Sequence, residues 1–534
     1  MKNYNMNKQF FFFLFYISHF YLSAQSFDGF ALFNSSGSST TKLIDKNLNI
    51  VHEWNTTTDC NYTVLLKKNG NLVRGTKYSG NILNGAADGG RVQELAPDGS
   101  IVWDFIYSDA NHLSHHDMTL IGDNVLLTAW EVKSAAEVSA AGYTGNIGNA
   151  GKWPTHFIEL EPDGNGSANI VWEWHIWDHL CQDVDPNKPN YVTNISEHPH
   201  LIDINMIQNS GGGPGGGGGD WFHVNGVDYN EELDQIVFSS RFSSEIYIID
   251  HSTTTQEAAG STGGNSGMGG DILYRWGNPS NYGMPGAQII TSAVHDSRWI
   301  ENDGRPNGGF LQIFNNCGNG CTGGGPNSQA NSTIDGIETP WDPLTKTYIR
   351  NAGQPFGPSS YTTRYECQYS SGGQSASNRM SNGNIFVNAS GSGAGVMYEV
   401  DGITEQIVWG PYPSDSQKGF RYECDYPGII ALKNWLSDTT TCSFPSNDNF
   451  IDEENKFIIY PNPSSYDINI DLALFNQQIE GLFIYDMFGK IVFSQEHFFN
   501  NNFSFTLDGL KRGIYTVNIL TSSNLYTKHF SYSK

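Results

Sequence analysis

The sequence predicts an all-β protein that consists of a six-bladed β-propeller followed by a small C-terminal β-sandwich. A short sequence unit recurs six times over nearly 370 residues, and the composition changes near residue 450. The chain has 534 residues with 59 glycines, 13% aromatic and only 16% charged residues. Such a composition is typical of many short strands joined by glycine-rich turns.

The first residues have the pattern of a secretory signal peptide, predicted for residues 1–24. Lys2 and Lys8 precede an apolar run from Phe10 to Leu22, and small residues lead to a cleavage site after Ala24. A membrane anchor is the less favoured alternative, because that run is shorter than the roughly 20 residues that a spanning helix needs. We therefore expect an exported mature chain without a transmembrane anchor.

The recurring unit predicts the propeller domain, which we place at residues 25–445. Each copy has an apolar pair, an acidic residue, a glycine turn and then a Trp-containing strand. The copies are LIDKNLNIVHEW (43–54), ELAPDGSIVWDF (94–105), ELEPDGNGSANIVWEW (159–174), IIDHSTTT with ILYRWG (248–277), YEVDGITEQIVWG (398–410) and a degenerate IETPWDPLTKTYIRNAG (337–353). Six sequential units of short antiparallel strands favour six blades. A two-sheet sandwich does not explain the repeat.

Two further features belong to this domain. The strand GFALFN at 29–34 is expected to join the last blade and close the ring, which removes free sheet edges. Insertions at 131–156, 178–222 and 251–271 are expected to be loops on one face. The run GGGPGGGGG (211–219) favours a mobile loop, either a flap over a site that begins at Asp220 or a surface insertion.

Residues 450–534 predict a separate small β-sandwich, with strands such as LFIYDMFGKIVFSQ and RGIYTVNIL. The segment resembles the C-terminal sorting domain of the type IX secretion system of Bacteroidota. The residues behind the resemblance are Tyr460-Pro461-Asn462-Pro463, Tyr485-Asp486 with Gly489-Lys490, and Leu510 with Gly513-Ile514-Tyr515. The resemblance implies passage across the outer membrane, with the type IX machinery as a partner and a secreted or cell-surface location.

Charge and cysteine content narrow the class of protein further. A formal net charge of −26 argues against nucleic acid and anionic membranes as partners. The seven cysteines of an exported chain can form disulfides. Cys317 and Cys321 are close enough in sequence to clip a loop, and Cys367 and Cys424 are a plausible pair because both end an Arg-Tyr-Glu-Cys segment. Zinc is the alternative, but no CxxC spacing supports it.

Three histidines, His116, His223 and His295, follow Trp motifs at the same phase of the repeat. In a propeller this phase is the start of the innermost strand of a blade, so the three imidazoles are expected to face the central channel. Tyr62 and the segment 372–375 share the phase. Clustered imidazoles can serve as nucleophile, general acid or base, metal ligands or anion binders.

The segments around two of these histidines resemble the bacterial arylsulfate sulfotransferase family. The segments are DWFHVNGVDYNEELDQIVFSSR (220–241), SAVHDSRWI (292–300) and GFLQIFNN (309–316), and the similarity extends over roughly residues 27–412. The resemblance implies a six-bladed propeller that transfers a sulfuryl group from an aryl sulfate to a phenol through a sulfated histidine, without a cofactor. It implies that His223 and His295 contact the sulfate or transfer protons.

At two positions the sequence departs from the family pattern. The family's arginine would follow Phe314-Asn315-Asn316, where no arginine stands, and its nucleophilic histidine would follow Gly372-Gly373, where Gln374 stands. We therefore expect Arg241 or Arg298 to supply the positive charge and His116 to be an alternative nucleophile. Asn225 and Asn316 complete the predicted substrate-binding residues.

Two other functions remain open at this stage. A binding protein that keeps an anion-binding channel without catalysis is favoured by the absence of histidine between His295 and His497. A metal-dependent hydrolase that uses the same histidines is the third interpretation. His175 and His179, with Asp183 and Asp185, have metal-like spacing, but a network between loops is the favoured interpretation, and no metal is assigned.

Overall fold

The computed structural model describes residues 26–437 and 457–532 with gaps. The gaps are at 82, 84, 209–218, 287, 289–292, 320, 323–328, 392–394, 461–466, 473–478, 486–490, 497–501, 508–509, 512 and 522–524. The predicted signal peptide and nearly all of the glycine run lie outside the described residues. The chain divides into two compact units, Met1–Cys442 and Ser443–Lys534.

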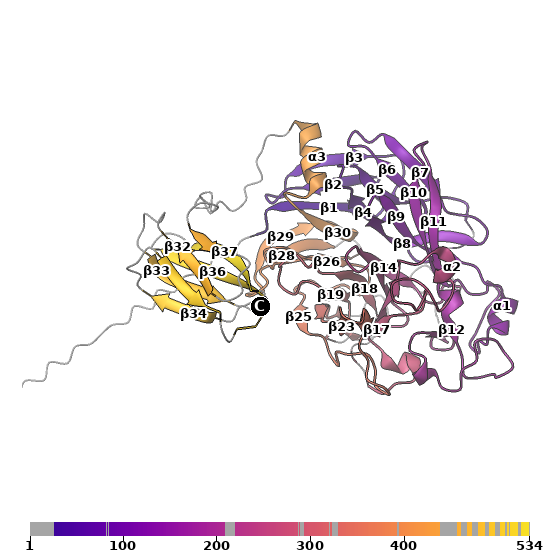
Figure 1. The fold of residues 1–534 in the computed structure, drawn as a ribbon. Helices are drawn as coiled ribbons and strands as arrows, with labels where there is room; N and C mark the ends of the chain where they lie inside the picture. Colours follow the sequence, from indigo (N-terminus) through magenta and orange to yellow (C-terminus); the bar gives the residue numbers. More distant parts are fainter. Residues whose placement is uncertain are drawn as a thin grey trace, which may run out of the picture. The chain divides into compact units, whose positions relative to one another are not determined.

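Six four-stranded antiparallel sheets form the described part of the first unit. One strand of each sheet, which we call the inner strand, contacts the inner strands of the sheets before and after it, and this sequence of contacts returns to its start. The inner strands are β4 (Cys60–Leu66), β8 (His112–Ile121), β14 (Val224–Asn230), β18 (Val294–Trp299), β26 (Ala376–Arg379) and β30 (Ser416–Glu423). Figure 1 shows these strands around a common centre.

The other strands extend each sheet outward in chain order. The second strands are β5 (Leu72–Lys77), β9 (Asn124–Glu131), β15 (Gln235–Ser240), β19 (Leu311–Asn315), β27 (Ile385–Ala389) and β1 (Gly29–Ser35). The third strands are β6 (Gly90–Leu95), β10 (Thr155–Pro162), β16 (Glu245–Asp250), β22 (Thr333–Ile337), β28 (Val396–Val400) and β2 (Thr40–Ile44). The outer strands are β7 (Ile101–Ile106), β11 (Ala168–His175), β17 (Tyr274–Trp276), β25 (Thr363–Glu366), β29 (Ile407–Pro413) and β3 (Ile50–Asn55).

The sixth sheet joins the two ends of the first unit. Strand β1, which contains the GFALFN segment, pairs antiparallel with β30, so that Leu32 lies opposite Phe420. The N-terminal segment supplies three strands of this sheet and the C-terminal segment supplies the inner one. Their pairing gives both segments a backbone partner and removes two exposed sheet edges.

The Trp of the recurring unit lies on the outer strand and is buried in five of the sheets, as Trp54, Trp103, Trp172, Trp276 and Trp409. Trp54 packs with Leu43 of its own sheet and with Leu72 of the next one. The space between neighbouring sheets is therefore the core of this unit. The degenerate sixth copy differs: its Trp341 lies on a separate hairpin, and Thr363–Glu366 forms the outer strand.

Short elements occupy the insertions. Three two-stranded pairs are β12 (Leu180–Cys181) with β13 (Ile202–Asp203), β20 (Cys321–Thr322) with β21 (Gln329–Ala330), and β23 (Trp341–Asp342) with β24 (Thr347–Tyr348). The helices are α1 (Ala135–Ala140), α2 (Thr255–Ala258) and α3 (Pro427–Leu436), with 3-10 turns η1 (Ile176–His179), η2 (Ile195–Glu197) and η3 (Pro279–Tyr282). None of the helices in the described residues has the length and apolar composition needed to cross a membrane.

One of the two predicted disulfides is wrong. Cys317 and Cys424 each take part in a disulfide, whereas Cys367 is a free thiol, so the predicted pair of Cys367 with Cys424 does not form. The two Arg-Tyr-Glu-Cys segments that suggested a Cys367–Cys424 pair end an outer strand, β25, and an inner strand, β30, of different sheets. Their sequence similarity therefore does not bring their cysteines together.

The second unit has two antiparallel sheets that share one hydrophobic core. The strands of the first are β31 (Ile458–Tyr460), β32 (Asp467–Asp471) and β35 (Asn502–Thr506). Those of the second are β33 (Ile479–Tyr485), β34 (Ile491–Glu496), β36 (Gly513–Thr521) and β37 (Leu525–Tyr532). Ile468 and Ile470 alternate with polar residues on β32 and pack against Leu482 and Val517 of the other sheet.

Candidate functional site

The predicted histidines come together at one end of the inner strands. His116 lies on β8, His223 directly precedes β14 and His295 lies on β18. The rings of His116 and His223 are 4.6 Å apart between centroids, and His295 is close enough to both to influence the pKa of His116 and to be influenced by His223. All three side chains are buried. The phase of the repeat therefore located the cluster correctly.

The backbone at this end of the inner strands is irregular in a consistent way. The pairing of β8 with β9 shifts register between Ser114 and Met118, and that of β18 with β19 shifts between His295 and Arg298. A β-bulge of this kind turns a side chain away from the regular alternation. His116 and His223 also have positive φ, 48° and 55°. Strained backbone of this type is found most often at functional sites.

The orientation of the His295 ring follows from Asn316. Asn316 Nδ2 donates to the carbonyl oxygens of Ser371 (2.9 Å) and Gln374 (3.1 Å), which fixes the amide, and its Oδ1 lies 2.7 Å from His295 Nδ1. An amide oxygen only accepts, so His295 Nδ1 is the protonated nitrogen. Within the described residues Nε2 of His295 has no hydrogen-bond partner, and its lone pair faces away from Asn316.

His223 has a carboxylate partner instead. Its Nδ1 donates to Asp220 Oδ2, three residues earlier in the chain. A carboxylate at Nδ1 stabilises the imidazolium form and orients Nε2 for proton transfer. Asp220 was not among the predicted site residues, although its position just before His223 is visible in the sequence.

His116 lies in a group of aromatic rings. Its Nδ1 is 2.8 Å from Nδ1 of His115, whose ring stacks on Trp130 at 4.1 Å. Tyr62 meets His116 edge-on at 5.3 Å, and among the described residues its buried hydroxyl has no hydrogen-bond partner. Tyr62, His115 and His116 line a common pocket. Phe242, the residue after Arg241, lies 4.7 Å from the His223 ring.

The two candidate arginines have different surroundings. Arg241 donates to the carbonyl oxygen of Gly372 at 3.4 Å. Its charge adds to the lowering of the pKa of His295, and it offsets part of the rise that burial causes in the pKa of Tyr62. No carboxylate pairs with Arg241 in the described part of the chain. Arg298, in contrast, forms an ion pair with Asp296 at 2.8 Å and packs over Phe420. Arg298 lines another pocket, with Asp228 and Glu301.

Burial is the main reason why the pKa values of His116 and His295 lie well below 6.5. The charge of Arg241 adds to this effect at His295, and the neighbouring imidazoles add to it at His116. Both histidines are therefore neutral at ordinary pH. A neutral imidazole with an open Nε2 is a nucleophile, and Arg241 beside it is suited to hold an anion.

The remaining predicted residues are part of the framework. Asn225 is fully buried; its Nδ2 donates to the carbonyl oxygen of Val294, and its Oδ1 accepts from Ser239. It thus joins β14 to β18 behind His295. Gln374 has a φ of 55°, and its side-chain Oε1 accepts from Ser390.

His175 and His179, whose spacing resembles that of metal ligands, belong to two different networks of polar contacts. His179 contacts Asp271 at 2.9 Å and the carbonyl oxygen of Ala258, while His175 lies between Glu131 and Glu173. Nowhere in the part of the chain that the structure describes do three or more His, Cys, Asp or Glu side chains meet in a way that could hold a metal ion.

The chain was compared with solved structures and curated proteins. It is similar to a protein of unknown function from Bacteroides caccae (10% identity, 74% of this chain and 98% of that one, TM-score 0.38). It is also similar to one from Desulfotomaculum acetoxidans (8%, 74% and 99%, 0.35). A third is the Cps50 (Swd1) β-propeller domain of Myceliophteria thermophila (9%, 72% and 86%, 0.31). No curated protein matches the sequence.

Two family models match the sequence. Residues 28–257 match the arylsulfotransferase family. Residues 458–532 match the secretion system C-terminal sorting domain, which indicates an exported protein. The first match includes His116, His223 and Arg241, and its family agrees with the resemblance noted in the sequence. The chain thus combines a segment that matches the arylsulfotransferase family model, residues 28–257, with a segment that matches the C-terminal sorting domain, residues 458–532.

Proposed function

We propose that this protein is an exported sulfotransferase that moves a sulfuryl group from an aryl sulfate to a phenol, with His295 as the nucleophile. The observation behind the proposal is the open Nε2 of a neutral His295 next to Arg241, a half-buried cation without a carboxylate partner in the described residues. An uncompensated guanidinium beside a nucleophile suits a substrate with a sulfate group.

The first half-reaction forms a bond between His295 Nε2 and sulfur while the bond from sulfur to the aryl oxygen breaks. The departing aryloxide takes the proton from Nε2 of His223, whose ring is oriented by the hydrogen bond from its Nδ1 to Asp220. Arg241 holds the sulfate oxygens as negative charge moves through them. Tyr62 and Phe242 offer aromatic surfaces beside the histidines for the aryl ring.

The second half-reaction reverses these steps with the acceptor. The phenol gives its proton to His223 Nε2 and its oxygen attacks sulfur, so the bond between sulfur and Nε2 of His295 breaks. His295 is again neutral, His223 is again protonated, and the product is a new aryl sulfate. The departure from the family pattern at Gln374 does not prevent this chemistry, because His295 supplies the nucleophile.

We also propose the architecture that goes with this function. The six sheets with contacting inner strands are the blades of a six-bladed β-propeller, and the histidine site lies at one end of its channel. We propose further that the type IX secretion machinery recognises the sorting domain and exports the propeller to the cell surface or the medium; the match at residues 458–532 supports this.

A transfer assay tests the proposal. The protein is incubated with a chromogenic aryl sulfate and a second phenol, and both the released phenol and the newly sulfated phenol are measured. We expect acceptor-dependent transfer that falls at least about 1,000-fold in His295→Asn, because the nucleophile is lost. His52→Gln, on the outer strand β3, is the matched control and should keep wild-type activity. If the wild type binds the aryl sulfate in calorimetry but never transfers it, the protein is a binding protein instead.

A further inference from the structure

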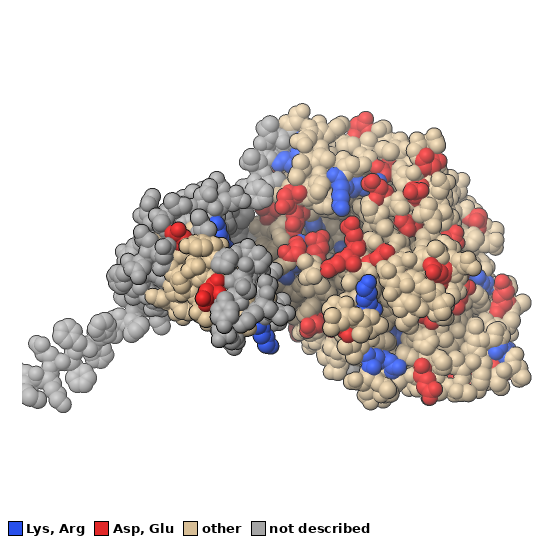
Figure 2. All heavy atoms as spheres, in the orientation of Figure 1, with Lys and Arg blue, Asp and Glu red and all other residues tan. Residues whose placement is uncertain are grey.

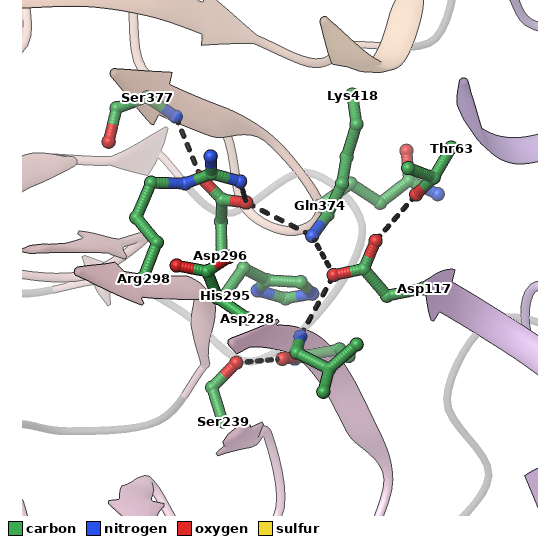
Figure 3. A network of polar contacts seen from close by, with 12 residues as sticks. Thr63, Asp117, Asp228, Ser239, His295, Asp296, Arg298, Gln374, Ser377 and Lys418 are labelled. Carbon is green, nitrogen blue, oxygen red and sulfur yellow. Dashed lines mark hydrogen bonds and ion pairs between the residues drawn. The ribbon is translucent and has the colours of Figure 1, made fainter. Parts of the chain in front are cut away.

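A buried lysine lies beneath the histidine site. Lys418 of β30 is fully buried, and its Nζ lies 2.6 Å from Asp117 Oδ2 and 3.1 Å from Asp296 Oδ1. Figure 3 shows this ammonium between the two carboxylates, with the His295 ring beside them. The three residues come from β8, β18 and β30, strands of three different sheets.

The two aspartates directly follow two of the site histidines. Asp117 follows His116, and Asp296 follows His295, within the bulged parts of β8 and β18. Each carboxylate also accepts a backbone N–H from the inner strand of the next sheet, Asp117 from Val227 and Asp296 from Ser377. A change in the position of either carboxylate would therefore move the neighbouring imidazole.

The charges of this group balance. Lys418 and Arg298 are positive, Asp117 and Asp296 are negative, and Thr63 donates a further hydrogen bond to Asp117 at 2.6 Å. A buried ion pair is weak evidence for stability, since apolar side chains of similar volume are often as good. Charged groups paired between the inner strands define how these strands are positioned relative to one another. This points to a role in holding the strands at a fixed spacing.

We propose that Lys418 is a positioning residue of the histidine site, which sets the spacing of His116 and His295 by tying Asp117 to Asp296 across the centre of the ring. The proposal rests on the proposed function, in which His295 attacks sulfur at a distance fixed by the protein. Lys418 is separated from the reacting atoms by the aspartates that it holds, so it acts through them.

The lysine has a second effect on the same histidines. Its charge contributes to the lowered pKa of His116 and of His295. The other charged or titratable groups that face these two imidazoles are His115, His223, Arg241, Tyr62, Asp117, Asp220 and Asp296. Loss of the ammonium alone should therefore make both imidazoles easier to protonate.

Lys418→Met in the full-length protein tests the proposal. We expect kcat to fall about 100-fold, the effect of a misplaced reacting group, with little change in the KM for the aryl sulfate, which Lys418 does not touch. The acid limb of the pH profile should move to higher pH. The control is Lys67→Met: Lys67 is another buried lysine, paired with Glu94 at 2.8 Å. It is not among the groups that shift the pKa of His116 or His295, and its loss should change neither quantity.

A second variant separates geometry from charge and guards against misfolding. Lys418→Met with Asp117→Asn removes one charge of each sign and keeps an oxygen for the Val227 N–H. It should keep the low kcat, because the tie is gone, while its acid limb returns toward that of the wild type. A Lys418→Met protein that is folded and has the kcat and pH profile of the Lys67→Met control would overturn the proposal.

A measurement without turnover distinguishes this proposal from the proposed function. Nuclear magnetic resonance of ¹⁵N-labelled histidines reports the pKa values of His116 and His295 directly. We expect both pKa values to be higher in Lys418→Met than in the wild type and in Lys67→Met. If the wild type has no transfer activity, the proposed function fails, yet this comparison still decides the role of Lys418: unchanged histidine signals would contradict it.

Discussion

Asn316 determines which nitrogen of His295 is available for chemistry. Its amide is held by two backbone carbonyl groups, so only its oxygen can face the imidazole. The sequence predicted Asn316 as a substrate contact, but in the described residues its side chain hydrogen-bonds with His295, Ser371 and Gln374. A residue that orients a nucleophile has the same polar character as one that binds a substrate. Sequence alone therefore does not distinguish the two roles.

Arg241 should control both the rate and the pH dependence of transfer. The wild-type acid limb of kcat/KM is expected below pH 6.5, because burial and the Arg241 charge lower the pKa of His295. In Arg241→Gln the pKa of His295 should rise. As the pH is lowered, the imidazole is then protonated at a higher pH, so the acid limb of kcat/KM shifts to higher pH. We expect kcat to fall about 100- to 1,000-fold, since a group that stabilises transition-state charge is removed.

The measurement is kcat/KM from pH 4 to 9 for wild type and variant. Arg350→Gln is the charge-matched control, because Arg350 lines a different pocket with Asp342 and Phe356. An acid limb at the same pH in Arg241→Gln and in wild type would show that Arg241 does not act on His295.

The sequence predicted most of the site residues from one regularity. The phase of the repeat located His116, His223 and His295 together with Tyr62, and the structure brings them to one end of the inner strands. Lys418 stands near the start of the last inner strand, but a single lysine without a partner nearby in the sequence gave no reason to single it out. Its partners, Asp117 and Asp296, are distant in sequence. They contact Lys418 only because the inner strands of three sheets lie side by side.

At the scale of elements, the bulged inner strands place the site. The hydrophobic repeat predicted the outer hairpins, because alternation and the Trp are visible in the sequence. The register shifts inside β8 and β18 are not visible in the sequence, because they arise from the pairing of two strands. Residues 337–353 resembled a degenerate sixth copy of the repeat because Trp341 stands where the other copies have the Trp of the outer strand. In the structure Trp341 belongs instead to a separate hairpin of β23 and β24.

The sheet shared by both ends of the first unit should be important for its stability. Leu32 of β1 is fully buried in the core between this sheet and its neighbour. Leu32→Ala is expected to lower the free energy of unfolding by about 2–5 kcal/mol, the cost of a cavity in a packed core. Ile101→Ala on the outer strand β7, where the side chain is exposed, should change it by less than about 0.5 kcal/mol.

Urea denaturation of the two variants measures both values. Equal effects of Leu32→Ala and Ile101→Ala would mean that the pairing of β1 with β30 is not part of the cooperative core, and the closed arrangement of sheets would then be in doubt.

The molecule as a whole is acidic, whereas the proposed site offers a positive charge, Arg241, to its substrate. The chain has a net charge of −26, and Figure 2 shows acidic side chains spread over the visible face of the first unit. Salt screens such surface charges over about 8 Å at physiological ionic strength, so binding of an anionic aryl sulfate depends on the local charge of Arg241. The net charge argued against nucleic acids as partners, but it could not show this local positive charge.

The two units have different roles: the second carries the export signal, and the first carries the proposed site. The sorting domain match at 458–532 indicates export, and the residues of the proposed site all belong to the first unit. The sequence predicted the sorting domain from short motifs. Those motifs lie partly in residues that the structure does not describe, but the alternating strands around them form the core of the second unit.

In the proposed mechanism His295 becomes covalently sulfated. The most direct measurement is mass spectrometry of the protein after incubation with an aryl sulfate and no acceptor, followed by peptide mapping at a pH that preserves the bond between nitrogen and sulfur. We expect one added sulfuryl group per chain on the peptide that contains His295. The group should disappear when a phenol is added, and it should be absent in His295→Asn. A protein that transfers sulfuryl groups while the added mass is found on His116, or on no residue, would contradict the account.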